Sequence, residues 1–571
     1  MSDAFAIRAL EIHSRYVWDF DHVRRALDFI ARQGMTSLIL HRNDIVDRIV
    51  WPARFFGASG SETNIFQRYR AIHRSLYQYT PTRRSGPYHR REYLKRVIEL
   101  AARQGTEVWF QNKELFFHEI FLELRPELTK DGHLCPSEPF WQDFVETKYT
   151  ELFQELPGLA GIITAPGTGE SRLSIAANRC TCSLCATNTP KRWYTGLLHA
   201  MHRPVSAAGK RLVVRDFVFD KKAQDALADS FAELPREIAV SLKNTPHDYY
   251  PTFPDNPRIG RVGDRPQWVE FDCMGQYFGW GIAPAILIEQ WRDRLAVAKQ
   301  AGVEGLVFRT DWESLDSHTA FHTPNLINLH AGAALGRDPA TPTRTIFLRW
   351  LEEQRMLRAE ATQQQCEACA EWAERLLNGS WDVVRRALYT NDCVFNDSST
   401  YPVGLEHAWW LAEEKNSLKD WDPSKVDALA PDEANIRRLL AEKDEAVARV
   451  EAVLPLLDAP PAGLTDGALE DLRWRMAVCH RYVRGFRALG RALLLARALT
   501  ATPAPTAAWR VEAGRLFDEA QAELLVRAAD FERFAATTDY RYTVYVLLGH
   551  ERLRTLHADL AARVAALPAA A

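Results

Sequence analysis

The sequence predicts a TIM-type (β/α)8 barrel followed by an all-α C-terminal domain, and three observations support this fold class. Eight short apolar segments recur between residues 6 and 309, and amphipathic helical segments separate most of them. A polar or charged cluster follows each apolar segment. Alternation of strands and helices implies parallel pairing, and eight parallel strands close into a barrel. We therefore predict a barrel over residues 1–340 and a helical domain over residues 341–571.

Each predicted strand is an apolar run that ends where polar residues begin. The strands cover residues 6–13, 36–40, 107–110, 158–164, 211–214, 238–242, 268–273 and 305–309. The helices between them are predicted from apolar residues at helical spacing, at residues 23–31, 91–103, 140–155, 191–208, 223–231 and 285–301. Glycines at positions 34, 105 and 302 end three of these helices, as is common at helix C-termini.

An open, doubly wound sheet is the structural alternative to the barrel. Gly167 and Gly169 follow the fourth strand, but the third glycine and the helix start of a nucleotide-binding loop are missing. The barrel is therefore favoured, with a last helix at residues 324–335.

The second predicted domain is almost entirely helical. Helices are expected at residues 347–377, 433–457, 468–499, 507–537 and 539–567, with proline-rich loops at 458–463 and 501–505. No internal repeat is evident, so we expect this domain to serve packing or homodimerisation.

Composition excludes several classes of protein. The 571 residues carry a net charge of −3, which gives no electrostatic signature for binding nucleic acid or an anionic membrane. No apolar run approaches the ~20 residues that span a bilayer. The amino terminus lacks the features of a signal peptide, and nine cysteines in so long a chain do not form a disulfide framework, so we expect a cytoplasmic protein.

Four strand-end residues are the main candidates for chemistry. Glu170 lies on a glycine-rich turn after the fourth strand, where a carboxyl with a raised pKa could act as a general acid. Arg215 and Lys243 end the fifth and sixth strands and could together hold a carboxylate, and Asp248 follows Lys243 by five residues. The alternatives are exposed loop residues and, for the cations, structural ion pairs with Asp216, Glu270 or Asp272.

Further substrate contacts are expected from the polar clusters and aromatic residues near the strand ends. The candidates are Asn43, Glu114, Asp272, Gln276, Tyr277, Asp311 and Trp312. Aromatic side chains there could stack on sugar rings, although we expect half of the set to be barrel core. That set is Trp51, Trp109, Phe110, Tyr249, Tyr250, Tyr277, Trp280 and Trp312.

Cys180, Cys182 and Cys185 form the tightest spacing of potential metal ligands in the sequence. Three thiolates could bind zinc with Cys135 or His133 as the fourth ligand, but two separated Cys-x-x-Cys pairs are missing. We therefore favour free thiols and predict no metal and no cofactor. Cys366 and Cys369 lie three residues apart on a predicted helix, where packing is the expected role.

The central part of the chain resembles glycoside hydrolase family 67, the α-glucuronidases. The similarity rests on Lys243-Asn244-Thr245-Pro246-His247-Asp248-Tyr249, on Arg215-Asp216-Phe217-Val218, on the Glu270–Gly279 segment and on Gly169-Glu170-Ser171. The resemblance covers about residues 150–340, including the last predicted helix. Because the first predicted strand starts within ten residues of Met1, we expect no counterpart of the family's amino-terminal β domain.

This resemblance implies specific roles. Glu170 would be the general acid and Asp248 a general base of an inverting hydrolase, while Arg215 and Lys243 would bind the carboxylate of a uronic acid. Gln276 stands where the family has a second base, and Pro166 replaces a lysine of the family pattern. Base catalysis would then fall to Asp248 alone or with help from Asp272.

The sequence therefore predicts a glycoside hydrolase that releases a glucuronic-acid-like sugar from oligosaccharides, in polysaccharide degradation, by an inverting acid/base mechanism. A hexosaminidase-like glycosidase is one alternative, although the adjacent Asp-Glu pair of that class is replaced by Gly169-Glu170. A non-catalytic carbohydrate-binding barrel is the other, and Gln276 is the residue that suggests it.

Overall fold

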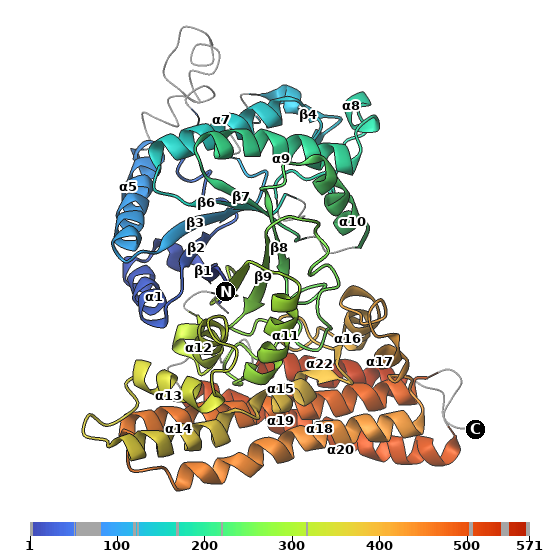
Figure 1. The fold of residues 1–571 in the computed structure, drawn as a ribbon. Helices are drawn as coiled ribbons and strands as arrows, with labels where there is room; N and C mark the ends of the chain where they lie inside the picture. Colours follow the sequence, from blue (N-terminus) through green and yellow to red (C-terminus); the bar gives the residue numbers. More distant parts are fainter. Residues whose placement is uncertain are drawn as a thin grey trace. The chain divides into compact units, whose positions relative to one another are not determined.

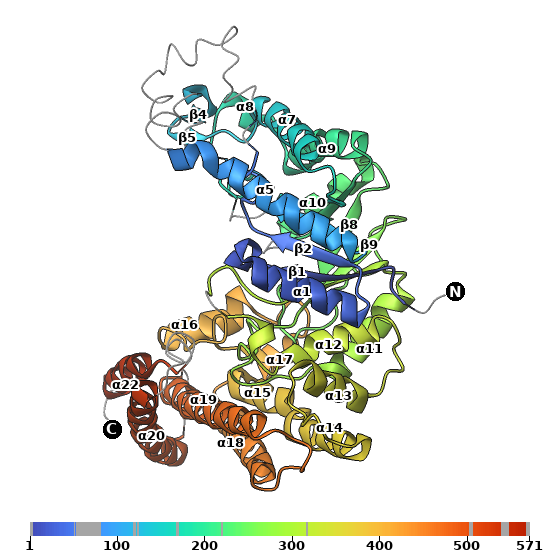
Figure 2. The same cartoon turned by 90° about the vertical axis from the view of Figure 1, so that its left-hand side faces the viewer.

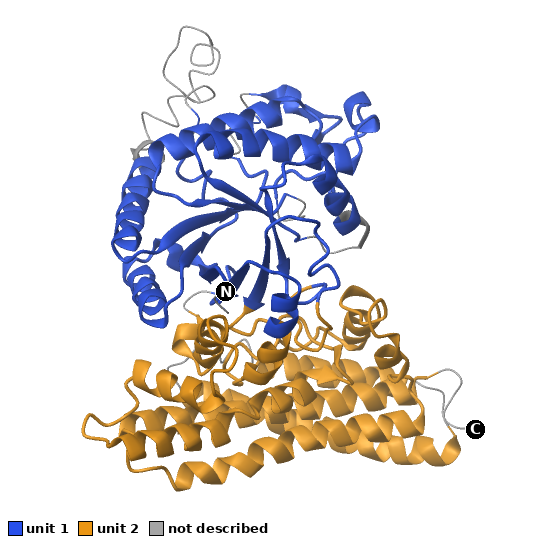
Figure 3. Cartoon of the chain, in the orientation of Figure 1, with its two compact units in different colours: residues 1–247, 256–271, 295–317 blue, residues 248–255, 272–294, 318–571 orange. Residues whose placement is uncertain are grey.

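The computed structural model describes residues 4–50, 52, 81–117, 122, 125–166, 171–217, 221–315, 318–501, 506–537 and 548–566, without the side chains of 81–85 and 221–223. The chain divides into two compact units, coloured separately in Figure 3. The first comprises residues 1–247, 256–271 and 295–317, and the second comprises residues 248–255, 272–294 and 318–571. Segments that precede residue 340 thus cluster with the helical region. The units are defined by clustering in space and not by position along the chain, so the domain boundary predicted at residue 340 stays a prediction.

Eight parallel strands close into a barrel in the order β1-β10-β9-β8-β7-β6-β3-β2, which confirms the predicted fold class (Figure 1). Each predicted strand is present to within a few residues. Their bounds are β1 (Ile7–Ile12), β2 (Ser37–His41), β3 (Glu107–Asn112), β6 (Gly161–Thr164), β7 (Arg211–Arg215), β8 (Ala239–Lys243), β9 (Gln267–Asp272) and β10 (Gly305–Arg309).

Helices of the first unit lie on the outside of these strands, as Figures 1 and 2 show. Local sequence explains where they begin and end. The Asp19 carboxylate accepts the His22 N–H at 3.0 Å at the start of α1, and Gly34 ends that helix with a left-handed φ of 63°. The helices are α1 (Phe20–Gln33), α5 (Pro81–Arg103), α7 (Phe140–Glu155), α9 (Pro190–Ala207) and α10 (Lys221–Ser230), and α11 (Ile288–Gln300) spans the boundary between the units.

One apolar layer fills the interior of the barrel, and every strand contributes to it. Its members are Ile7, Ala9, Ile39, Trp109, Ile163, Val213, Ala239, Trp268 and Val307. The two tryptophan rings of this layer meet edge to face with centroids 4.9 Å apart. A Cβ on Gly161 would lie 2.5 Å from the Trp109 ring, and a Cβ on Gly305 would lie 2.7 Å from the Trp268 ring. Glycine at positions 161 and 305 therefore provides the space that the rings occupy.

The described part of the second unit is a helical assembly with a small hairpin. Its helices are α12 (Leu326–Leu335), α13 (Thr343–Glu353), α14 (Gln363–Leu377), α15 (Ser380–Leu388), α16 (Leu405–Trp410), α17 (Pro423–Asp427), α18 (Glu433–Val453), α19 (Asp466–Leu499), α20 (Ala507–Thr537) and α22 (His550–Ala565). Packing joins α18 to α19, α19 to α20 and α20 to α22. The predicted homodimerisation through this region stays a prediction.

Two expectations for the helical region are corrected. The helix predicted over residues 347–377 is two helices, because Arg355 adopts a left-handed φ of 54° and Thr362 starts α14 with a capping box to Gln365. The sequence also gave no indication of the hairpin formed by β11 (Tyr389–Thr390) and β12 (Cys393–Val394). Positive φ values at Asn391 and Asp392 form its turn.

Within the described ranges, no helix combines the length and the apolar character that crossing a membrane requires.

Candidate active site

The interior of the barrel changes from apolar to polar toward the carboxyl ends of its strands. Side chains alternate along a strand, so residues two positions after the apolar layer also point inward. All of these residues are at most 4% exposed, and they are Glu11, His41, Gln111, Arg215, Ser241, Glu270 and Arg309. Carboxyl ends of barrel strands are the usual location of active sites in this fold. We therefore take this polar layer and the residues just beyond it as the candidate active site.

A buried ion pair joins two strands of this layer. Arg215 Nε donates to Glu270 Oε1 and Oε2 at 2.9 and 2.7 Å, and Arg215 Nη2 lies 2.7 Å from Glu270 Oε2. Ser241 Oγ donates to Glu270 Oε1 at 2.6 Å. Glu270 is one of the three partners considered from the sequence. A contact between Arg215 and a substrate carboxylate stays a prediction.

A histidine pair and a glutamate form a second cluster at the ends of β1 and β2. The His13 and His41 rings stack with centroids 3.6 Å apart, and His41 Nδ1 lies 2.7 Å from Glu11 Oε1. Burial raises the pKa of Glu11 to about 8, although the positive charge of Arg215 opposes the shift. Burial also lowers the pKa of His13 to about 4 and the pKa of His41 well below its ordinary value. Burial therefore favours the neutral forms of the Glu11 carboxyl and the His41 ring near neutral pH, with one hydrogen bond joining Glu11 Oε1 and His41 Nδ1.

Residues after β10 hold His13 in place. Both oxygens of Asp311 accept backbone N–H groups, from His13 at 2.6 Å and from Ser14 at 3.2 Å. Glu313 Oε2 lies 2.9 Å from His13 Nε2. Burial raises the pKa of Asp311 to about 6, although the hydrogen bonds from His13 and Ser14 favour the carboxylate and lower the pKa. Asp311 thus positions the chain after β1, and its predicted contact with substrate stays a prediction.

Three cations surround one aromatic ring at the ends of β3, β7 and β8. The ring is that of Phe217, and its centroid lies 3.9 Å from Lys243 Nζ, 4.9 Å from Lys113 Nζ and 4.6 Å from Arg215 Cζ. All three cations are at most 2% exposed. Aromatic faces attract cations, but several buried positive charges close together also favour binding of an anion.

Glu114 lies on the opposite side of β3 from the polar layer. Its carboxylate accepts hydrogen bonds from Asn112 Nδ2 at 2.8 Å, from Lys148 Nζ at 3.1 Å and from the Tyr149 hydroxyl, and the last two residues belong to α7. Alternation explains this orientation, because Trp109 points into the barrel and residue 114 is five positions later. Its predicted substrate contact stays a prediction.

Two other predicted residues of the first unit are half-buried. The Asn43 carbonyl accepts the Lys113 N–H at 3.1 Å, and its side-chain oxygen accepts no hydrogen bond from the described residues. The Trp312 carbonyl accepts the Leu315 N–H at 3.3 Å. Their side chains remain candidates for contact with a substrate. The predicted general acid, Glu170, and Trp51 lie outside the described residues.

The predicted base, Asp248, belongs to the second unit together with Tyr277. Asp248 Oδ2 accepts the Tyr277 hydroxyl at 2.7 Å, and Oδ1 accepts the Tyr249 N–H at 2.9 Å. The Tyr277 ring also contacts the Tyr250 ring, with centroids 4.3 Å apart. These donors stabilise the carboxylate as a hydrogen-bond acceptor in a fixed orientation, which suits a general base.

Asp272 and Gln276 organise the loop that follows β9. The Asp272 carboxylate accepts the N–H groups of Met274, Gly275 and Gln276 at 3.1, 3.2 and 2.9 Å. Gln276 Nε2 donates to Ser398 Oγ at 3.4 Å. Asp272 therefore has a clear structural role, and the predicted contacts of both residues with substrate stay predictions.

Sequence reasoning missed the buried members of this site. Glu11 is absent from the sequence-based candidates because it lies within a strand and not at its end, and Glu270 appears there only as a possible ion-pair partner of the cations. A charged residue inside an otherwise apolar strand was the available signal, because a buried charge requires a partner. Three further residues of the site lie within two positions of a predicted residue: Lys113, His41 and Glu313. Counting every second residue along the inward face of β3 and β2 selects Lys113 and His41.

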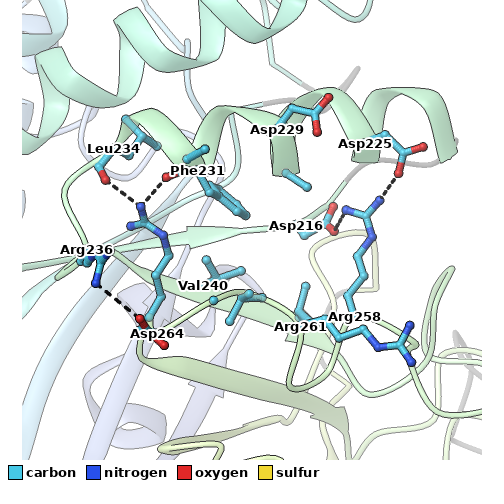
Figure 4. A pocket seen from close by; sticks show the side chains of 16 residues that line it. Asp216, Asp225, Asp229, Phe231, Leu234, Arg236, Val240, Arg258, Arg261 and Asp264 are labelled. Carbon is cyan, nitrogen blue, oxygen red and sulfur yellow. Dashed lines mark hydrogen bonds and ion pairs between the residues drawn. The ribbon is translucent and has the colours of Figure 1, made fainter.

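A cavity of about 590 Å³ lies elsewhere in the first unit. Val240 and Leu242 line it, so it faces the outer side of β8, opposite to Ser241 and Lys243. Figure 4 shows Arg258 within it, donating to Asp216 at 3.2 Å and to Asp225 at 2.7 Å. These ion pairs join α10 to the barrel, so this cavity is not the candidate active site.

The comparisons with known proteins show a shared fold. No family model matches the sequence, and no curated protein matches it. Among solved structures, a GH138 enzyme targeting pectin rhamnogalacturonan II aligns with 99% of this chain and 67% of its own, with a TM-score of 0.61 and 10% identity.

Two further neighbours have lower scores. An O-GlcNAc hydrolase from Thermobaculum terrenum aligns with 97% of this chain and 94% of its own, at a TM-score of 0.41 and 12% identity. A GH20 exo β-N-acetylglucosaminidase from Vibrio harveyi aligns with 62% of this chain and 58% of its own, at a TM-score of 0.37 and 10% identity. These three neighbours are glycoside hydrolases, and the likeness to the GH138 enzyme shows the fold.

Proposed function

We propose that the protein is a glycoside hydrolase that releases a uronic acid from oligosaccharides. The cluster of Lys113, Arg215 and Lys243 around Phe217 carries the proposal. A sugar carboxylate is an anion that suits this cluster. A GH138 enzyme of similar fold targets pectin, a uronic-acid-containing polysaccharide, which agrees with this substrate class.

The proposed reaction is an inverting hydrolysis. Glu170 donates a proton to the glycosidic oxygen as the bond to the anomeric carbon breaks. Asp248 removes a proton from the water that attacks the opposite face of the sugar, and Tyr277 holds the Asp248 carboxylate for this step. Inverting enzymes keep the two carboxyl groups ~6.5–9.5 Å apart to admit that water. The similarity of the Lys243–Tyr249 segment to the α-glucuronidases supports the α-glucuronidase-like assignment.

The buried pair of Arg215 and Glu270 supports the same site without taking part in proton transfer. Glu270 balances the charge of Arg215, and Lys113 and Lys243 are the further cations that attract the sugar carboxylate in this scheme. The neutral Glu11 and His41 pair adds hydrogen-bonding groups without adding negative charge.

A screen of the purified protein tests the proposal. Oligosaccharides bearing glucuronic or galacturonic acid, and their neutral hexose counterparts, should be offered in parallel, with product stereochemistry read by NMR. We expect release of the uronic acid with inversion and no comparable release of the hexose. Preferential turnover of neutral or N-acetylated sugars would contradict the substrate class, and binding without turnover would indicate a carbohydrate-binding barrel.

A further inference from the structure

Four cysteines of the first unit converge although they come from two distant parts of the chain. The sulfur atoms of Cys135, Cys180, Cys182 and Cys185 all lie within 4.8 Å of one another. Cys135 Sγ is 3.5 Å from both Cys182 Sγ and Cys185 Sγ. Cys135 is thus the fourth member of the set, whereas His133 is exposed and lies outside it.

The spacing of these sulfur atoms matches a tetrahedral metal site. Zinc–sulfur bonds of about 2.3 Å in a tetrahedron place the sulfur atoms about 3.8 Å apart. A disulfide would bring two of them to about 2.05 Å, and all four cysteines are free. Close packing for hydrophobic reasons is a poor explanation, because Cys182 and Cys185 are half-buried rather than in a core.

Rigid local structure presents each side of the cluster. Cys135 follows a short hairpin of β4 (Thr129–Lys130) and β5 (His133–Leu134), and its N–H donates to the Leu128 carbonyl at 2.9 Å. Trp141 Nε1 donates to the Cys135 carbonyl at 2.9 Å. The hairpin turn uses positive φ values at Asp131 and Gly132.

The other three cysteines lie on a loop and a short helix, α8 (Ser183–Ala186). Cys180 N–H donates to Asn178 Oδ1 at 2.8 Å, and Cys182 immediately precedes the helix that carries Cys185. A direct link joins this loop to the segment after the hairpin, because Asn188 Nδ2 donates to Ser137 Oγ at 3.0 Å. Both sides of the cluster are therefore ordered by contacts that do not involve sulfur.

We propose that Cys135, Cys180, Cys182 and Cys185 bind a structural zinc ion. All four positions of a tetrahedral site are then filled by protein, which is the arrangement of structural rather than catalytic zinc. Four thiolates around Zn²⁺ leave a net negative charge, and the Lys130 ammonium, which is paired with Glu138, also interacts electrostatically with Cys135 and Cys182. The ion would fasten the loop after β6 to the hairpin after β3. This site is independent of the proposed hydrolase activity.

Metal analysis of the full-length protein, purified without added metal or chelator, tests the proposal directly. We expect one zinc ion per chain, released when an organomercurial titrates the thiols and measured with a colorimetric zinc indicator. Cobalt substitution should give the visible absorption bands of tetrahedral cobalt and a thiolate-to-cobalt charge-transfer band. These measurements use the wild-type chain and do not depend on a variant that folds.

Variants give the second line of evidence. Cys182→Ser and Cys185→Ser should each lower the bound zinc at least ~10-fold, because zinc favours a complete ligand set. Cys366→Ser, a half-buried cysteine on α14, is the matched control and should retain one zinc per chain. Wild-type protein without zinc whose four thiols react as free thiols, or a stoichiometric content of iron in place of zinc, would overturn the proposal.

Discussion

His13 and His41 stack with their ring planes within 5° of parallel and their centroids 3.6 Å apart, at the ends of neighbouring strands. Two protonated imidazoles would repel each other strongly in this arrangement. The low pKa of both rings, which burial causes in each case, keeps them neutral near pH 7. Glu11 completes the cluster as a neutral acid, so Glu11, His13 and His41 provide hydrogen-bonding groups without net charge, beside the Glu313 carboxylate 2.9 Å from His13 Nε2.

The Glu11→Gln variant should alter the pH dependence of stability. Burial raises the Glu11 pKa from 4.5 to about 8 in the folded chain, so the unfolded chain binds fewer protons between these values. The contribution of Glu11 to the free energy of unfolding is therefore largest below about pH 4.5 and falls as pH rises to about 8. Glutamine cannot ionise, so the stability of the variant relative to wild type should increase over that range. Urea denaturation at several pH values measures the free energy of unfolding of both proteins, with Glu99→Gln on the exposed face of α5 as control. Parallel curves of unfolding free energy against pH for wild type and Glu11→Gln would disprove the prediction.

Breaking the buried Arg215 and Glu270 pair should destabilise the barrel. Glu270→Gln leaves the Arg215 guanidinium buried without its countercharge, which costs about 3–5 kcal/mol in comparable cases. The pair of Arg211 and Glu107 is a matched control, because it joins residues of β7 and β3 at 2.7 Å but is more than 40% exposed. Glu107→Gln should change the free energy of unfolding by no more than about 1 kcal/mol. Equal losses in the two variants, measured by chemical denaturation, would show that burial of the first pair has no special effect.

Lys113 and Lys243 should determine the preference for an acidic sugar. Lys243→Met and Lys113→Met keep the length of the side chain and remove the charge, so each should lose about 1.5–3 kcal/mol of transition-state binding, roughly 10- to 150-fold in kcat/KM, on a uronide. The matched hexoside should lose far less. Lys299→Met is the control, because its ammonium lies 5.2 Å from the Phe5 ring centroid on an exposed side chain. Equal losses on uronide and hexoside would assign both lysines a structural role.

The proposed acid and base should differ in their response to the leaving group. Glu170→Gln and Asp248→Asn should each lower turnover of a natural glycoside by at least ~10²-fold. An activated aryl leaving group needs no protonation, so it should restore activity to Glu170→Gln but not to Asp248→Asn. Tyr277→Phe should reduce turnover less, since it removes one hydrogen bond to Asp248. Asp229→Asn, on an exposed residue of α10, is the control, and near-normal turnover in either principal variant would exclude that residue from the mechanism.

Much of the fold could be predicted from local patterns. The bounds of α7 and β10 coincide with the prediction because apolar periodicity and the flanking turn residues agree there. The break between α13 and α14 was missed because a left-handed residue such as Arg355 does not interrupt helical periodicity. The strands β11 and β12 are only two residues long, and their apolar residues do not distinguish a short hairpin from a helix, so the sequence does not predict them.

The site was less predictable, because it depends on strand register. Arg215 and Glu270 are 55 residues apart in sequence, and their contact follows from the order of β7, β8 and β9 in the closed barrel. The orientation of Glu114 required knowing which face of β3 points inward, and Trp109 settles that only in the assembled core. The sequence leaves Cys135 and His133 as alternatives for the fourth member of the cysteine cluster, and only the fold selects Cys135.

The close fit between two glycines and two tryptophans in the barrel interior constrains how this sequence can diverge. Gly161 leaves room for the Trp109 ring and Gly305 for the Trp268 ring, and the two rings meet each other. A larger residue at position 305 requires a smaller residue at position 268, whereas a Cβ at position 161 would also lie 2.2 Å from the Arg211 carbonyl oxygen, a backbone atom that no change at position 109 removes. Among homologous chains positions 305 and 268 should therefore vary together, position 161 should stay glycine, and a chain that keeps both tryptophans should keep both glycines.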